Sequence, residues 1–148
     1  MRLLIQRVSR AKVTVDHKVT GEIGAGLLVF LGIGEDDTDE ICSEMVKKAS
    51  HLRIFEDEQK KMNQDVASVS GSVLVVSQFT LYADTQRGNR PSFTKAAKPE
   101  FAMGLYNKFI YEMKQILGEN RVAEGFFGAM MEVELINDGP VTIWVDSC

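Results

Sequence analysis

The sequence is poor in cysteine, since Cys42 and Cys148 are its only two. A disulfide framework needs more cysteines than this, so we expect two free thiols, as in a reducing compartment. Together with the only two histidines, His17 and His51, the cysteines show none of the paired spacing of metal ligands. We therefore predict no metal site, and we expect no cofactor.

Long apolar runs are also missing. No stretch approaches the roughly 20 apolar residues that a membrane-spanning helix needs. The opening segment reaches Arg7 too soon for a signal peptide. We therefore expect a soluble, cytoplasmic protein that does not contact a membrane. The length of 148 residues predicts one domain, which we place over 1–148.

An excess of positive charge is absent as well, because the net charge is −4 and the pI is near 5.2. Nucleic-acid binders are usually basic, so any RNA contact must be local. The segment 85–99 is the candidate, since it contains no acidic residue. Its basic residues are Arg87, Arg90, Lys95 and Lys98. On charge alone, a solvated loop is the favoured interpretation.

Apolar patterning predicts strands in the first third of the chain. Alternation indicates strands at 3–8 and 11–15, and a turn at 16–18 leads to a hairpin partner at 19–23. The continuous apolar run 26–33 predicts a central strand covered on both faces.

Apolar residues at helical spacing predict two helices. Asp36, Asp37 and Thr38 can begin the first, and the second runs from Pro99 to Gly118. The first apolar stripe comprises Ile41, Met45, Val46, Ala49 and Leu52. The second comprises Phe101, Leu105, Tyr106, Phe109, Ile110, Met113, Ile116 and Leu117.

The remaining patterns complete the predicted fold. Segment 56–61 is polar and indicates an exposed loop, whereas 73–76, 131–135 and 141–145 indicate strands. Short links favour antiparallel pairs, and helical crossovers allow parallel ones. We predict a single-domain, layered α/β fold with mixed, largely antiparallel, barrel-like β-sheets and two helices.

Two polar segments are candidates for chemistry. Ser77, Gln78, Phe79 and Thr80 follow the buried strand 73–76, where a sheet can hold a site rigidly. Strand-end capping is the favoured alternative on the residues alone. The second segment, 137–142, has the composition of a hairpin turn, and nothing local in it predicts a cis Gly139-Pro140 bond.

Both segments resemble the signature motifs of the D-aminoacyl-tRNA deacylase family. The motifs are Ser77-Gln78-Phe79-Thr80-Leu81 and Asn137-Asp138-Gly139-Pro140-Val141-Thr142. Further similarity is found at Ile5–Ala11, Gly26–Val29, Leu31–Ile33, Gly88–Phe93 and Phe127–Met131. The resemblance runs over essentially the whole chain in the family's order.

The resemblance implies an editing hydrolase that acts as a homodimer. Its substrate would be a D-amino acid, or glycine, esterified to the 3′-terminal adenosine of a tRNA. The Gly139-Pro140 bond would be cis and would reach into the partner's pocket. Its carbonyls would then occupy the place of an L side chain, so that the L form is rejected by a clash.

Thr80 is the obvious candidate nucleophile, but a threonine hydroxyl needs a nearby base and no histidine stands at a family position beside it. The preferred hypothesis is attack by water, with the Phe79 N–H stabilising the oxyanion. Ser77, Gln78 and Thr80 would shape the site, and the ribose 2′-OH of the substrate could assist.

The resemblance also suggests binding residues. Phe127 and Met131 would line an adenosine pocket, although such side chains equally suit a core. Arg7 would brace the Gly139-Pro140 loop, or simply be solvated. The four basic residues of 85–99 become candidate contacts to acceptor-stem phosphates.

Two other functions stay open. One is an RNA-binding module without catalysis, and the other is a deacylase relative that edits a mischarged L-amino acid. The second would need a changed Gly-Pro loop, whereas Gly139-Pro140 has the pattern of the D-specific enzymes.

Overall fold

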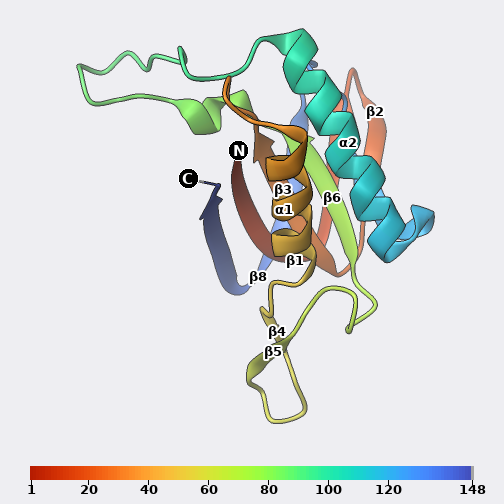
Figure 1. Ribbon diagram of the computed structural model, residues 1–148. Coiled ribbons are helices and arrows are strands. Elements are labelled where there is room, and N and C mark those ends of the chain that lie inside the picture. The colour runs from red at the N-terminus through yellow and green to blue at the C-terminus, as the bar shows by residue number, and fades with distance from the viewer. Residues whose placement is uncertain (148) are drawn as a thin grey trace.

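The computed structural model describes residues 1–147 and shows one curled, mixed sheet with two helices packed on one side of it (Figure 1). The sheet has the strand order β2-β1-β3-β6-β7, and β8 pairs with β1. Its strands are β1 (Arg2–Val15), β2 (Lys18–Ile23), β3 (Gly26–Gly32), β6 (Ser72–Ser77), β7 (Val122–Glu124) and β8 (Glu132–Asp146). The predicted α/β class with barrel-like sheets and two helices is confirmed.

The helices are α1 (Asp39–Ser50) and α2 (Pro99–Leu117). Thr38 caps α1 by accepting a hydrogen bond from the Ile41 N–H, and α2 begins at Pro99 and ends before Gly118 as predicted. None of the helices within residues 1–147 is both long and apolar enough to cross a bilayer.

Two apolar clusters cover the two faces of the sheet. Successive side chains of β3 belong to different clusters. Leu27 and Val29 pack in the cluster that contains the helices, whereas Leu28 packs in the other cluster with Leu74 of β6. The second cluster is closed by the curl of the sheet itself, where residues of β1 and β2 pack against β6. The predicted strand 26–33 is thus covered on both faces.

The predicted buried face of α2 is wrong at two of its eight positions. Phe101 and Ile116 are 47% and 41% exposed, whereas the other six members of the predicted stripe are buried. At about 100° per residue, position 101 is turned roughly 120° from the centre of the buried stripe. Ile116 lies at the margin of the same stripe in the last turn.

The strand boundaries correct the prediction at two places. The strands predicted at 3–8 and 11–15 are one strand, β1, and those predicted at 131–135 and 141–145 are one strand, β8. Because β8 pairs with β1 on both sides of residues 138–141, the hairpin predicted at 137–142 is wrong. The pairs Gln6–Thr142 and Val8–Asn137 leave four residues of β8 bulging opposite Arg7.

The polar segment 56–61 also differs from the predicted plain loop. Glu56 ends β4 (Phe55–Glu56), and residues 57–61 form the tip of a small hairpin that leads to β5 (Met62–Gln64). The Asp57 carboxylate organises this tip by accepting hydrogen bonds from the Gln59 and Lys61 N–H groups. These bonds hold the pKa of Asp57 below its usual range.

The topology places a site at one edge of the sheet. β3 and β6 are adjacent and parallel, so their carboxyl ends meet there. β6 continues directly into a short 3-10 helix, η1 (Phe79–Tyr82), and a second one, η2 (Glu119–Arg121), precedes β7. From η1 the segment 83–98 extends away from the sheet before it returns to α2 (Figure 1).

Candidate active site

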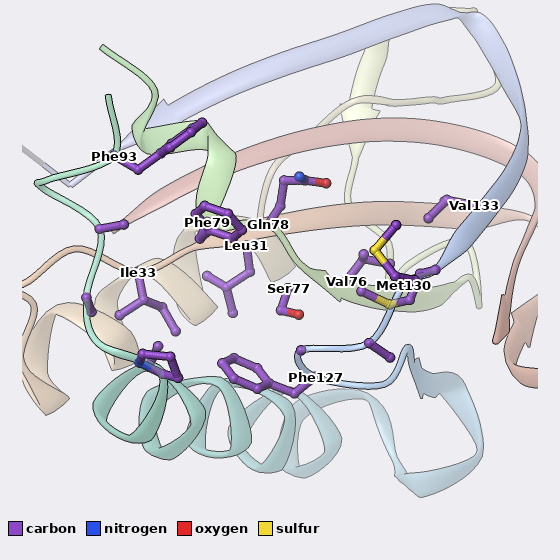
Figure 2. A pocket seen from close by; sticks show the side chains of 17 residues that line it. Leu31, Ile33, Val76, Ser77, Gln78, Phe79, Phe93, Phe127, Met130 and Val133 are labelled. Carbon is purple, nitrogen blue, oxygen red and sulfur yellow. The ribbon is translucent and has the colours of Figure 1, made fainter. Parts of the chain in front are cut away.

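A cavity of about 620 Å³ lies where β3 and β6 end, beside the start of α2. Figure 2 shows Ser77 directed toward Phe127 across it, with Phe79 and Phe93 on one side and Met130 and Val133 on the other. The lining residues are Leu31, Ile33, Val76, Ser77, Gln78, Phe79, Phe93, Ala96, Ala97, Pro99, Ala102, Phe127, Gly128, Ala129, Met130, Met131 and Val133. No ionisable side chain is among them, so the cavity offers hydroxyl, amide and backbone groups only.

The segment 77–79 is brought to the cavity by the end of β6. The Gln78 N–H donates to the Leu31 carbonyl at 2.8 Å, which continues the pairing with β3 one residue beyond the strand. The chain then turns into η1, where Phe79 makes an edge-to-face contact with Phe93 at a centroid distance of 5.2 Å. Three of the four predicted residues, Ser77, Gln78 and Phe79, therefore line one cavity.

Thr80 itself does not line the cavity. It lies exposed on η1, and its hydroxyl oxygen accepts a hydrogen bond from the Gln78 side-chain amide. Neither histidine lines the cavity: His17 lies in the turn between β1 and β2, and His51 caps the end of α1. The structure thus places no histidine base among the groups around the cavity.

Phe127 and Met131 both line the cavity, and both also pack against the core, Phe127 on the first apolar cluster and Met131 on the second. The ring of Tyr106 supports Phe127 at 5.4 Å. Tyr106 also donates to the Val75 carbonyl at 3.2 Å, and the Gly125 N–H donates to the same oxygen at 3.0 Å. Burial raises the pKa of Tyr106, which stays a neutral donor. This wall is therefore fixed to β6.

Gly139 and Pro140 lie at the exposed tip of the bulge in β8, and the bond between them is cis. Neither is among the residues that line the cavity of the same chain. Arg7 is only 6% exposed beneath the bulge and donates to the carbonyls of Asp138 and Ile54. The bracing interpretation of Arg7 is thus the correct one, and the solvated one is wrong.

The four basic residues of 85–99 are exposed. A backbone pair between Asp84 and Ser92 closes the base of the loop that carries Arg87 and Arg90. The same segment contributes Phe93, Ala96 and Ala97 to the cavity. The basic side chains therefore belong to a loop that is part of the cavity wall.

Sequence reasoning missed several lining residues, among them Leu31, Ile33, Phe93 and Met130. Leu31 and Ile33 look like plain strand core, whereas Phe93 fell within a segment that matched the family pattern. Among residues 1–147, no three His, Cys, Asp or Glu side chains gather closely enough to hold a metal ion.

Comparison with known proteins gives consistent similarities over the full length. The family model described as D-Tyr-tRNA(Tyr) deacylase matches residues 4–146. The chain is 54% identical over 149 residues to a D-aminoacyl-tRNA deacylase of Thermotoga petrophila, covering 99% of this chain and 97% of that protein. It is 56% identical over 147 residues to one of Akkermansia muciniphila, with the same two coverages.

Two solved structures are similar in fold. One is of a c-Myc DNA unwinding element binding protein, with a TM-score of 0.94 and 41% identity, covering 99% of this chain and 98% of that one. The other is of a probable eukaryotic D-amino acid tRNA deacylase, with a TM-score of 0.83 over 97% of each chain. At 20% identity the second shows the fold alone.

Proposed function

Because the chain belongs to the D-Tyr-tRNA(Tyr) deacylase family, we propose that it hydrolyses the ester between a D-amino acid and a tRNA. The products are the free D-amino acid and the tRNA, and the reaction takes place in the cytoplasm. The observation that carries the proposal is the cavity at the ends of β3 and β6, which Ser77, Gln78 and Phe79 line opposite Phe127.

The 3′-terminal adenosine occupies this cavity. The cavity volume of about 620 Å³ lies in the range of small-molecule sites, and the cavity lining is mainly apolar with a few polar groups. A base can stack on Phe127, whose ring is held from behind by Tyr106. Met131 completes the wall beside it.

Water rather than Thr80 attacks the ester carbonyl carbon, because none of the side chains that line the cavity could act as the base that a threonine nucleophile needs. The Phe79 N–H stands at the first position of η1, where a 3-10 ladder supplies no acceptor, and it stabilises the oxyanion. The bond to the ribose 3′-oxygen then breaks, and that oxygen takes up a proton from the attacking water with help from the 2′-OH. Ser77 and Gln78 position the substrate, and Thr80 orients the Gln78 side-chain amide by accepting its hydrogen bond.

Selection against L-amino acids comes from Gly139 and Pro140. Both are exposed and do not line the cavity of their own chain, which suits a segment that enters the cavity of a second copy in a homodimer. The buried Arg7 fixes the position of this segment through its hydrogen bond to the Asp138 carbonyl. The carbonyls of Gly139 and Pro140 occupy the place of an L side chain. Glycine has no side chain to reject, so Gly-tRNA is cleaved to some extent.

The acceptor stem is held by the loop next to the cavity. Arg87, Arg90, Lys95 and Lys98 are exposed there and can reach phosphates. Phosphate contacts add affinity without reading sequence, as suits an enzyme that acts on many tRNAs.

The test is the release of amino acid from D-Tyr-tRNA and L-Tyr-tRNA, measured side by side with the purified protein. We expect cleavage of the D form only, and a dimer by sedimentation. Cleavage of neither form would favour the alternative of a non-catalytic RNA-binding module. Equal cleavage of both forms would refute the role of Gly139 and Pro140, and a monomer would refute selection across subunits.

A further inference from the structure

The short helix η1 carries Phe79 and Thr80, yet little within the helix itself holds it in place. It spans only Phe79–Tyr82, has no side-chain cap and contains no buried residue. A 3-10 turn of this length has poor hydrogen-bond geometry and gains little stability on its own. Its position must therefore come from contacts with other elements.

The floor beneath η1 is made by Gly32, the last residue of β3, and Gly34, two residues beyond it. A Cβ on Gly32 would lie 3.0 Å from the Leu81 Cβ, and one on Gly34 would lie 2.7 Å from the Tyr82 hydroxyl oxygen. The helix can rest this closely on β3 only because these positions lack side chains. This floor limits how far η1 can move toward the sheet, but it does not prevent η1 from sliding or lifting.

Contacts of Arg2 oppose the sliding and lifting of η1 that the glycine floor allows. The Arg2 Nη1 donates to the Leu81 carbonyl at 2.9 Å, and its guanidinium carbon stands 4.5 Å from the centre of the Tyr82 ring. The same guanidinium donates from Nε to Asp146 of β8 at 3.1 Å and stands 5.7 Å from the Trp144 ring. One planar group thus ties η1 to both β1 and β8.

From this geometry we infer that Arg2 is a positioning residue for the reaction: it fixes η1, and through η1 the Phe79 N–H, against the sheet. The inference rests on the proposed function. Arg2 does not line the cavity. Its effect therefore falls on kcat, because a misplaced oxyanion donor weakens an interaction made in the transition state.

A plain cross-strand ion pair is the competing explanation, and the chain offers a matched control for it. Lys12 pairs with Glu134 at 3.3 Å, on the same two strands β1 and β8. Lys12 lies ten residues further along β1 than Arg2, and its ion pair includes no residue of η1. If Arg2 only joined the strands, Arg2→Ala and Lys12→Ala would behave alike.

The experiment compares wild type, Arg2→Ala, Arg2→Lys and Lys12→Ala in steady-state cleavage of D-Tyr-tRNA. For Arg2→Ala we expect kcat to fall roughly 10- to 100-fold with KM nearly unchanged, the scale of a small misplacement of a catalytic group. Arg2→Lys should show a smaller fall in kcat than Arg2→Ala. A lysine ammonium cannot donate to both the Leu81 carbonyl and the Asp146 carboxylate in the way that the planar guanidinium does. Lys12→Ala should keep the wild-type kcat.

Hydrogen–deuterium exchange of the peptide 78–84 provides a second measurement that is independent of activity. We expect faster exchange there in both Arg2 variants and none of this change in Lys12→Ala. A wild-type kcat in both Arg2 variants, or unchanged exchange of this peptide, would overturn the inference. If Arg2→Ala does not fold, Arg2→Lys decides. A wild-type protein without activity would count against the proposed function, and the exchange measurement would still decide whether Arg2 holds η1.

Discussion

The Nε of Arg7 donates a hydrogen bond to the Asp138 carbonyl at 3.1 Å and lies 3.3 Å from the carboxylate of the same residue. Arg7 therefore binds the bulge of β8 at Asp138, directly before Gly139. Its Nη1 donates to the Ile54 carbonyl at 2.7 Å, so a side chain of β1 links the bulge to the segment that follows α1.

Arg7→Met should destabilise the protein and loosen its selectivity. The variant leaves the Ile54 carbonyl without its charged donor in a buried place, which costs about 2–4 kcal/mol in the free energy of unfolding. A freer Gly139-Pro140 segment should allow some cleavage of L-Tyr-tRNA. Urea unfolding and the ratio of D to L rates measure both effects, with Lys12→Ala as control. Unchanged selectivity in a folded Arg7→Met would contradict the bracing role.

The elements that the sequence predicted well are those fixed by local signals. The start of α1 follows from Thr38, and α2 runs from Pro99 to Leu117 with Gly118 as its C-cap, because caps and helical spacing act within a few residues. The turn at Asp16 and His17 was also local, and both residues have positive φ there.

The errors came from partners that are distant in the chain. Residues 137–142 have the composition of a hairpin turn, but β1 is long enough to pair with β8 on both sides of them, so the chain bulges and continues. The burial of Arg7 depends on Ile54, far along the chain, and composition near Arg7 gives no sign of it.

The candidate site was predicted only in part, because some of its contacts also involve residues that are distant in the chain. The motif 77–80 follows a buried strand, and its first three residues line the cavity. That Thr80 does not line the cavity depends on η1, a turn too short to have a periodic signal. The contact of Phe79 with Phe93 depends on how the segment 83–98 returns to α2.

Thr80→Ala should remain active. The Thr80 hydroxyl oxygen already accepts from Gln78, and no base lies in the cavity to activate it. Losing one positioning hydrogen bond of about 1 kcal/mol predicts a fall of less than about tenfold in kcat. Loss of a nucleophile would cost roughly 10⁴-fold or more. Single-turnover kinetics and mass spectrometry distinguish these, since a trapped Thr80 ester would refute attack by water.

Phe127→Ala should raise KM for D-Tyr-tRNA. Loss of one base-stacking ring costs about 1–3 kcal/mol, which corresponds to roughly 5- to 150-fold in affinity. Phe127→Leu should lie between this variant and wild type. Phe101→Ala is the matched control, because that ring is 47% exposed on α2 and does not line the cavity. Equal KM values for Phe127→Ala and Phe101→Ala would place the adenosine elsewhere.

Removing Arg87 and Arg90 should weaken the salt dependence of tRNA binding. Each phosphate contact that is lost lowers the slope of log affinity against log salt by about one unit, so Arg87→Ala with Arg90→Ala should lower it by about two. Lys48→Ala with Lys61→Ala removes the same charge from exposed positions on α1 and on the β4–β5 hairpin, and should leave the slope unchanged.

A short substrate separates this electrostatic role from catalysis. The D-tyrosyl ester of adenosine has no acceptor stem, so both double variants should cleave it at the wild-type rate. If the arginine variant loses activity toward this ester too, the loop acts on the cavity through Phe93 and its neighbours rather than on phosphates. An unchanged salt slope with intact tRNA would mean that Arg87 and Arg90 are solvated, as their charge alone first suggested.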